Sequence, residues 1–392
     1  MKTNASTGTP SVLLCITRWR SKVVISIVAI ILLAVHFDVF DNAVPETSDV
    51  PLAVPETSDV PLAVHFDAFD NAVPKTSDVP LVTWDKNEEQ APLTIDADAY
   101  SVFFGNATAY NTDRDSPSNS RLVNAADFHA AWYADVLHHN LKEAFHFHRK
   151  QWEFIVIYRA ITTLVDFKAG PTGFGFGVGI EPLPSMLVAA GAKKLVASDM
   201  PMSDTGASNW EAGNQYAAEL SATWNSKTVD KATYFAAASF RSINMKALPD
   251  DLLRGGFDFT WSCSALEHQG TVNDAIAYMV NTARMLKPGG VAVHTTELIV
   301  SSLFLLVQMP NAFTMLRMQD IERLAIEVEK YDAKLTRRDY FAGLHKYDVR
   351  CDVQPYHSEE HLKLYRKDLL PSCHTSVLLV IQKNKKAPSE QE

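Results

Sequence analysis

The chain has 392 residues, of which 47% are hydrophobic and 21% charged, a composition typical of a globular protein with one large domain or two ordinary ones. Its formal net charge is −10, and the body of the chain contains no run of Lys and Arg. A nucleic-acid-binding surface needs a basic patch, so we expect no nucleic-acid partner. The four cysteines show no zinc-ligand spacing; only Cys351 and Cys373 are candidates for a disulfide, which leaves the compartment open.

The N-terminal region predicts a membrane anchor. Residues 1–22 form a basic tail, and residues 23–40 contain an apolar run that is short for a membrane span. Because basic residues precede the run and acidic residues follow it, we expect a cytosolic tail and a single-pass anchor, with the rest of the chain on the lumenal side of an ER- or Golgi-like membrane. A cleaved signal peptide or an organelle transit sequence is the alternative.

An internal repeat follows the anchor. Residues 34–52 and 63–81 are nearly identical, and residues 53–62 repeat the second half of the unit. These copies are rich in Pro, Asp, Ser and Thr, so we expect residues 41–83 to be a disordered stalk, with a docking repeat for a partner as the alternative. Residues 84–150 are expected to be a linker and a helical cap, with Asn106 in a glycosylation sequon. Strand and helix patterns alternate over residues 151–385, which predicts a doubly wound, mostly parallel α/β sheet.

A glycine run is the first chemical motif. An apolar strand leads into Gly175, Gly177 and Gly179, and Pro182 then stands where a helix begins. Glycines in this position let the backbone turn tightly and approach a ligand closely. A dinucleotide site would have a third glycine at Ile180. The tighter spacing is the one that S-adenosylmethionine sites use, because that cofactor has no pyrophosphate, although a glycine run alone does not decide the ligand.

An acid ends the next predicted strand. Residues 194–199 form an apolar strand that ends in Asp199, twenty residues after Gly179. A carboxylate at this place can accept hydrogen bonds from both hydroxyls of a ribose, although it could instead be a turn or cap residue. Met200, the next residue, could contact the adenine face or simply fill the core.

Two further strands are expected to end in polar residues. The segment 256–268 is an apolar strand followed by Ser264, Glu267 and His268. The segment 285–290, with the sequence MLKPGG, is a helix stop and a turn before a strand at 291–294 that leads to Glu297. Open α/β sheets bind ligands at the carboxyl ends of their strands, so we expect these side chains to lie in a binding site.

The ordered set of motifs resembles class I S-adenosylmethionine-dependent methyltransferases. More narrowly, the segments HRKQWEF (148–154), GFGVGIEPLP, WSCSALEH, LKPGGVAVHTTE, QPYHSEEHLKL and TSVLLVIQK resemble a group of methyltransferases of which some are found near glycan-assembly enzymes. The resemblance covers residues 127–383. It implies a seven-stranded, mostly parallel sheet whose last strand, at 376–382, is antiparallel, and it implies S-adenosyl-L-methionine as the cofactor. Asn244 stands where the family pattern has an acid.

The resemblance also implies roles for the motif residues. Gly175, Gly177 and Gly179 would line the methionine end of the cofactor, Asp199 would hold the ribose and Asn244 the adenine. Met200 and Ser264 are further candidates for binding the cofactor. Glu267, His268, His294 and Glu297 would face the substrate, with His268 or His294 as general base. A metal held by these groups, or a purely structural role for them, is the alternative.

The predicted reaction is methyl transfer to a small polar acceptor, with a sugar hydroxyl favoured by the family's neighbours and by the expected lumenal topology. The alternatives are an organellar S- or O-methyltransferase that acts on a small metabolite, and a catalytically silent, methyltransferase-like scaffold on a membrane stalk.

Overall fold

The computed structural model describes residues 116–204, 211, 213, 215–300, 314–343, 345–349, 351–353, 362–366 and 372–385. The predicted basic tail, anchor and repeat stalk, with most of the predicted linker, lie outside these residues. Within the described ranges, no helix has both the length and the apolar character needed to cross a bilayer.

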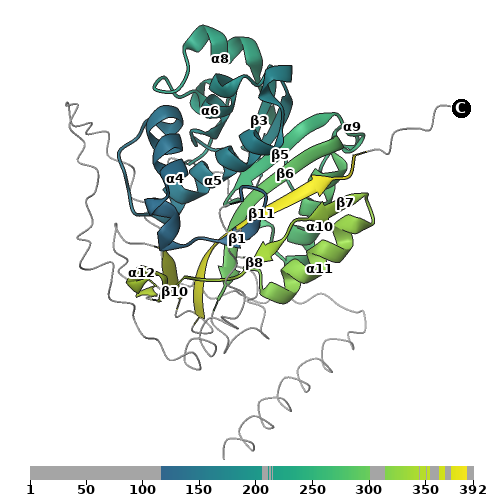
Figure 1. Cartoon of the computed structure of the whole chain (residues 1–392). Coiled ribbons are helices and arrows are strands. Elements are labelled where there is room, and N and C mark those ends of the chain that lie inside the picture. The colour runs from purple at the N-terminus through teal and green to yellow at the C-terminus, as the bar shows by residue number, and fades with distance from the viewer. Residues whose placement is uncertain are drawn as a thin grey trace, which may run out of the picture. The chain divides into compact units, whose positions relative to one another are not determined.

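The centre of the molecule is a mixed sheet (Figure 1). Its long strands are β2 (Thr172–Phe176), β3 (Lys194–Asp199), β4 (Ala238–Ser242), β5 (Phe257–Cys263), β6 (Leu286–Ile299) and β11 (Ser372–Lys383). They lie in the order β4-β3-β2-β5-β6-β11; the first five are parallel, and β11 is antiparallel to β6. The mostly parallel sheet and its antiparallel last strand are therefore confirmed.

Short strands enlarge the sheet, which has eleven strands among the described residues where seven were expected. They are β1 (Ser120–Leu122), β7 (Ala333–Leu335), β8 (Arg338–Asp339), β9 (Asp352–Val353) and β10 (Lys363–Arg366). Strand β6 also starts earlier than predicted, because Leu286 already pairs with Phe257, and the turn of the LKPGG segment is accommodated by an irregular register between Phe257 and Phe259.

Helices cover both faces of the sheet (Figure 1). One face carries α4 (Ala131–Val136), α5 (Arg149–Leu164), α6 (Leu183–Ala190) and α8 (Lys231–Ala237), and the other carries α9 (Asp250–Leu253), α10 (Val272–Arg284) and α11 (Met318–Glu329). A further short helix, α12, spans Lys346–Val349. Each face has its own apolar cluster, because side chains alternate along a strand: Phe174 packs with the α10 side, and Trp261 packs with the α5 side.

The segment expected to be a cap belongs to the main domain. Strand β1 pairs with β11, and the side chains of α5 pack directly against one face of the sheet. The helical segment that begins with α4 ends at Leu141; Lys142 then adopts a left-handed conformation (φ 57°), and the chain turns before α5 begins at Arg149. The expected boundary between residues 150 and 151 therefore falls inside the first turn of α5.

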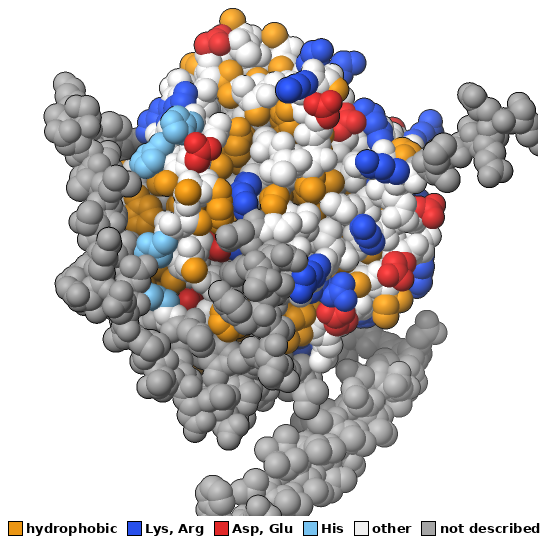
Figure 2. Space-filling view, in the orientation of Figure 1, with side chains coloured by type: hydrophobic (Ala, Val, Ile, Leu, Met, Phe, Trp, Pro, Cys, Tyr) orange, Lys and Arg blue, Asp and Glu red, His pale blue; other side chains and the backbone are white. Residues whose placement is uncertain are grey.

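The exposed charges of the described residues occur in both signs, and on the face shown in Figure 2 they are interspersed. Several form exposed ion pairs, such as Arg241 with Asp251 at 2.7 Å and Arg338 with Glu322 at 2.8 Å. Pairs of this kind typically contribute about 0–1 kcal/mol. The charged groups that matter most for this fold are therefore the buried ones described next.

Candidate active site

The glycine turn and Asp199 meet at the carboxyl edge of the parallel strands. The backbone N–H of Gly179 donates to Oδ2 of Asp199 at 3.1 Å, and so does the N–H of Ala217 at the same distance. Oδ1 accepts one hydrogen bond, from the N–H of Met200 at 2.8 Å. Burial raises the pKa of Asp199, while these three N–H donors act in the opposite direction. The carboxylate is thus fixed in place with acceptor capacity remaining on Oδ1.

The three glycines of the run have different surroundings. A Cβ on Gly175 would lie 2.2 Å from the Trp261 ring, so this glycine makes room for an aromatic side chain of β5. A Cβ on Gly179 would lie 2.3 Å from the backbone oxygen of Gln215. Only Gly177, with φ of 55°, faces a freer space, where Ala265 and Met245 would be 3.0 and 3.6 Å from an added Cβ. The missing side chain of Gly175 thus makes room for packing, and its place at the methionine end of the cofactor stays a prediction.

Asn244 and Met200 lie at the same edge of the sheet. Asn244 follows β4, and its amide Nδ2 donates to Oδ2 of Asp204 at 2.8 Å, so an acid does occur here but comes from the loop after β3. The carbonyl of Met200 accepts a hydrogen bond from the Tyr216 hydroxyl at 3.0 Å. Both residues are partly buried.

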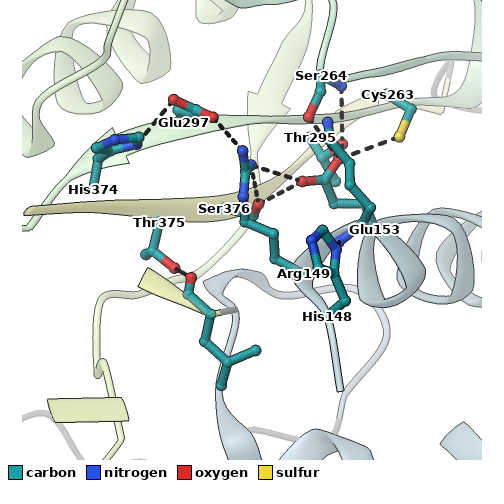
Figure 3. A network of polar contacts seen from close by, with 12 residues as sticks. His148, Arg149, Glu153, Cys263, Ser264, Thr295, Glu297, His374, Thr375 and Ser376 are labelled. Atoms are coloured by element: carbon teal, nitrogen blue, oxygen red, sulfur yellow. Dashed lines mark hydrogen bonds and ion pairs between the residues drawn. The ribbon is translucent and has the colours of Figure 1, made fainter. Parts of the chain in front are cut away.

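A buried network of charged residues lies beside this edge, between α5 and the ends of β5, β6 and β11 (Figure 3). Its central group is Glu153 of α5, whose side chain is fully buried. Oε2 of Glu153 accepts from Ser264 at 2.6 Å and from Lys150 at 3.3 Å, with Cys263 and Thr295 also at 3.3 Å. The carboxylate therefore connects the first turns of α5 to the ends of two neighbouring strands.

Arg149 links Glu153 to a second carboxylate. Its Nη2 donates to Glu297 at 2.6 Å, and its Nη1 donates to Ser376 at 3.2 Å and to Glu153 at 3.4 Å. The other oxygen of Glu297 lies 2.9 Å from Nδ1 of His374, and a dashed line marks this ion pair in Figure 3. Glu297, predicted to face the site, is thus part of an ion-pair network that involves α5, β6 and β11.

The neighbouring cations keep two of the buried carboxylates ionised. Burial alone would raise the pKa of Glu153, but the charges of Lys150 and Arg149 lower it below its ordinary value. Burial opposes ionisation of Glu297 as well, and Arg149 and His374 hold its pKa well below the usual range. The pKa of Lys150 is raised despite its burial, because of Glu153. These opposite charges stabilise one another.

The loop after β5 brings Ser264, Glu267 and His268 to the network. Ser264 has a left-handed backbone (φ 47°), a strained conformation for a residue other than glycine, and strain of this kind is common at functional sites. Burial, reinforced by the charge of Glu297, raises the pKa of Glu267 to about 7. Burial lowers the pKa of His268 to about 4. Glu267, rather than the histidine, thus titrates near neutral pH.

His294 is not in the site. It points to the α10 face of the sheet, where its ring nitrogens bond the hydroxyls of Ser262 at 2.8 Å and Thr282 at 2.9 Å. The side chain is fully buried, and burial lowers its pKa to about 3. Side chains alternate along β6, so Thr295 and Glu297 face α5 while His294 faces away from it. The structure therefore corrects the prediction that His294 is a general base of the site.

The sequence interpretation missed Arg149, Lys150, Glu153 and His374. A usable signal was present in HRKQWEF, where charged residues at 149 and 153 are spaced i, i+4 on a helix whose other residues are mainly apolar. A charge on the buried side of such a helix must have a partner. Across the described ranges, no group of three or more His, Cys, Asp and Glu side chains is arranged to hold a metal ion.

No protein-family model matches the sequence, and no curated protein matches it. An O-methyltransferase family protein from Burkholderia thailandensis is 13% identical, with a TM-score of 0.33 over 65% of this chain and 69% of that one. A methyltransferase from Mesorhizobium loti that depends on S-adenosylmethionine is 13% identical, with a TM-score of 0.35 over 59% and 98%. The [4+2]-cyclase SpnF is 10% identical, with a TM-score of 0.35 over 58% and 79%.

Proposed function

We propose that this protein is a methyltransferase that uses S-adenosyl-L-methionine and acts on a small polar acceptor, with a sugar hydroxyl as the favoured candidate. The observation that carries the proposal is the direct contact between the glycine turn and Asp199, 3.1 Å from the Gly179 amide to the carboxylate, at the carboxyl edge of the parallel strands. Ligands of open α/β sheets bind at this edge.

The residues present fit the cofactor. Gly177 leaves a space that any side chain would narrow, and Oδ1 of Asp199 can accept a further hydrogen bond, as from a ribose hydroxyl. When bound, the cofactor would supply a methyl group on a positively charged sulfur. The protein then has to position the acceptor, exclude water and take up a proton.

The charged network supports a polar acceptor next to the cofactor site. Ser264, at the end of β5, bonds Glu153 at 2.6 Å, and Glu267 follows it on the same loop. Buried carboxylates and hydroxyls at neighbouring strand ends suit an acceptor that forms several hydrogen bonds, as a sugar does. Such a site discriminates strongly against analogues that leave its polar groups unpaired.

Cofactor binding is the first test. In calorimetry with the full chain, we expect S-adenosylhomocysteine to bind and NAD to bind negligibly. Asp199→Ala should lose about 1.5–3 kcal/mol of binding free energy, the contribution of hydrogen bonds to a charged group. Gly177→Val should abolish binding, because its side chain enters the space opposite Ala265 and Met245.

Gly255→Ala is the matched control for Gly177→Val. Gly255 also has a positive φ, of 82°, but an added Cβ would come no closer than 3.5 Å to another atom. The control therefore introduces similar backbone strain just before the first residue of β5, away from the carboxyl edge of the sheet. It should bind S-adenosylhomocysteine normally. Binding of NAD without binding of S-adenosylhomocysteine would contradict the proposed function.

We also propose that the chain is anchored in a membrane with this domain on the lumenal side. The disulfide between Cys351 and Cys373 supports the proposal, since disulfides persist in oxidising compartments. We expect the protein to resist carbonate extraction and to carry a glycan on Asn106, which Asn106→Gln should remove. A protein that carbonate releases and that endoglycosidase leaves unchanged would instead indicate a transit or signal peptide.

A further inference from the structure

Glu267 differs from the other carboxylates of the network. Glu153 and Glu297 are each bonded to Arg149, whereas Oε2 of Glu267 is buried and has no hydrogen-bond partner among the described residues. The whole residue is only 4% exposed. A buried polar atom without a partner is rare in folded proteins and calls for an explanation, such as a catalytic role.

The titratable groups around Glu267 come from two packed elements and from its own loop. Lys150, Glu153 and Arg149 lie on α5, Glu297 lies on β6, and His268 is the next residue in the chain. The charges of Glu297 and Glu153 disfavour ionisation of Glu267, and the charge of Lys150 favours it. Burial and these charges together raise the pKa of Glu267 to about 7, which suits a group that exchanges protons at neutral pH.

The backbone holds Glu267 in position. It lies on the 3₁₀ turn Leu266–His268, directly after β5 and the strained Ser264, and its carbonyl accepts the N–H of Thr314 at 2.6 Å. The two histidines are poorer proton acceptors. His294 is enclosed on the other face of the sheet, and a group with the pKa of His268, about 4, is a weak base.

We propose that Glu267 is the catalytic base of this site and accepts the proton of the acceptor through its unpartnered oxygen, an inference that rests on the proposed methyl transfer. A lone pair of the acceptor's oxygen forms the bond to the methyl carbon, and the carbon–sulfur bond breaks with its electron pair going to sulfur. The acceptor's proton moves to the Glu267 carboxylate, which becomes neutral and later releases the proton to water. The acceptor must therefore carry a hydrogen on the attacking oxygen, as a hydroxyl group does.

The protonation of Glu267 can be tested without an acceptor. Dicyclohexylcarbodiimide labels carboxyl groups in apolar surroundings only when they are protonated, and mass spectrometry locates the label. In the full chain we expect labelling of Glu267 at about pH 6 that falls with a midpoint near pH 7, as its raised pKa requires. Glu153 and Glu297, which are held ionised, should remain unlabelled. A midpoint below about pH 5, or no label on Glu267 at any pH, would overturn the proposal.

Turnover tests the catalytic role. With radiolabelled S-adenosylmethionine and a mixture of D-mannose, D-galactose and N-acetyl-D-glucosamine as probe, Glu267→Gln should lower turnover about 10²–10⁴-fold and leave S-adenosylhomocysteine binding unchanged. The acid limb of the pH–rate profile should vanish in this variant. Glu322→Gln, at an exposed ion pair, is the control and should retain activity. Full activity in Glu267→Gln would overturn the assignment, whereas absence of S-adenosylhomocysteine binding in the wild type would refute the proposed function itself.

Discussion

Replacing Glu153 with alanine is expected to lower the free energy of unfolding by about 3–5 kcal/mol, the usual effect of breaking a buried ion pair by removing one partner. Glu153 is fully buried and accepts hydrogen bonds from Lys150, Arg149 and Ser264. Without its carboxylate, the two cations of α5 stay in a low-dielectric environment and lose the carboxylate that both of them contact. Urea denaturation followed by circular dichroism measures the effect.

Two variants show whether this loss comes from the charges. Asp251→Ala removes an ion pair of 2.7 Å that is exposed, so it should change the free energy of unfolding by less than about 1 kcal/mol. Combining Lys150→Met with Glu153→Gln removes one charge of each sign and should recover part of the stability lost in Glu153→Gln alone. Equal losses in Glu153→Ala and Asp251→Ala would show that the network does not stabilise the fold.

Replacing Glu267 with glutamine should make the protein relatively more stable as the pH rises. The folded-state pKa of Glu267 is about 7, above its ordinary value of 4.5, so the folded state holds this proton more tightly than the unfolded state does. The stability contributed by Glu267 is complete below the unfolded-state pKa and is lost as the pH rises through the folded-state pKa. Between about pH 5 and pH 8, the difference in free energy of unfolding should move by about 2–3 kcal/mol in favour of Glu267→Gln.

The comparison between variant and wild type is essential for this measurement. Burial lowers the pKa values of His268 and His294 to about 4 and about 3, so both histidines make the folded state more stable as the pH rises toward their ordinary value of 6.5. Their effect opposes that of Glu267 in the wild type but cancels in the difference between the two proteins. A difference that does not change with pH would show that Glu267 titrates normally.

The long strands could be predicted from the sequence because their signal is local. The apolar run Lys194–Asp199 is a strand with the predicted bounds, and Gly177 and Asp199 follow their strands at the places that the pattern indicated. A parallel sheet brings the carboxyl ends of its strands to one edge, so the meeting of the glycine turn and Asp199 was already implied by the order of strands. The anchor and the repeat stalk remain predictions.

The faces of the strands were also implied by the sequence, although the prediction did not use them. His294 and Glu297 are separated by an odd number of positions in one strand, so their side chains point to opposite faces. One faces Thr282 of α10, and the other faces Arg149 of α5. A ligand on one face cannot contact both side chains, and applying this rule would have removed His294 from the predicted site.

The sequence by itself thus determined the doubly wound sheet and the edge at which its polar residues gather. Only the tertiary structure decided that Glu153, Ser264 and Ser376, which are far apart in the chain, share one buried network. It also decided which groups titrate near neutral pH: Glu267 has a raised pKa and His268 a lowered one, although the two residues are adjacent. The physical reason is that a pKa depends on burial and on the charges that packing brings nearby, and neither is a local property of the sequence.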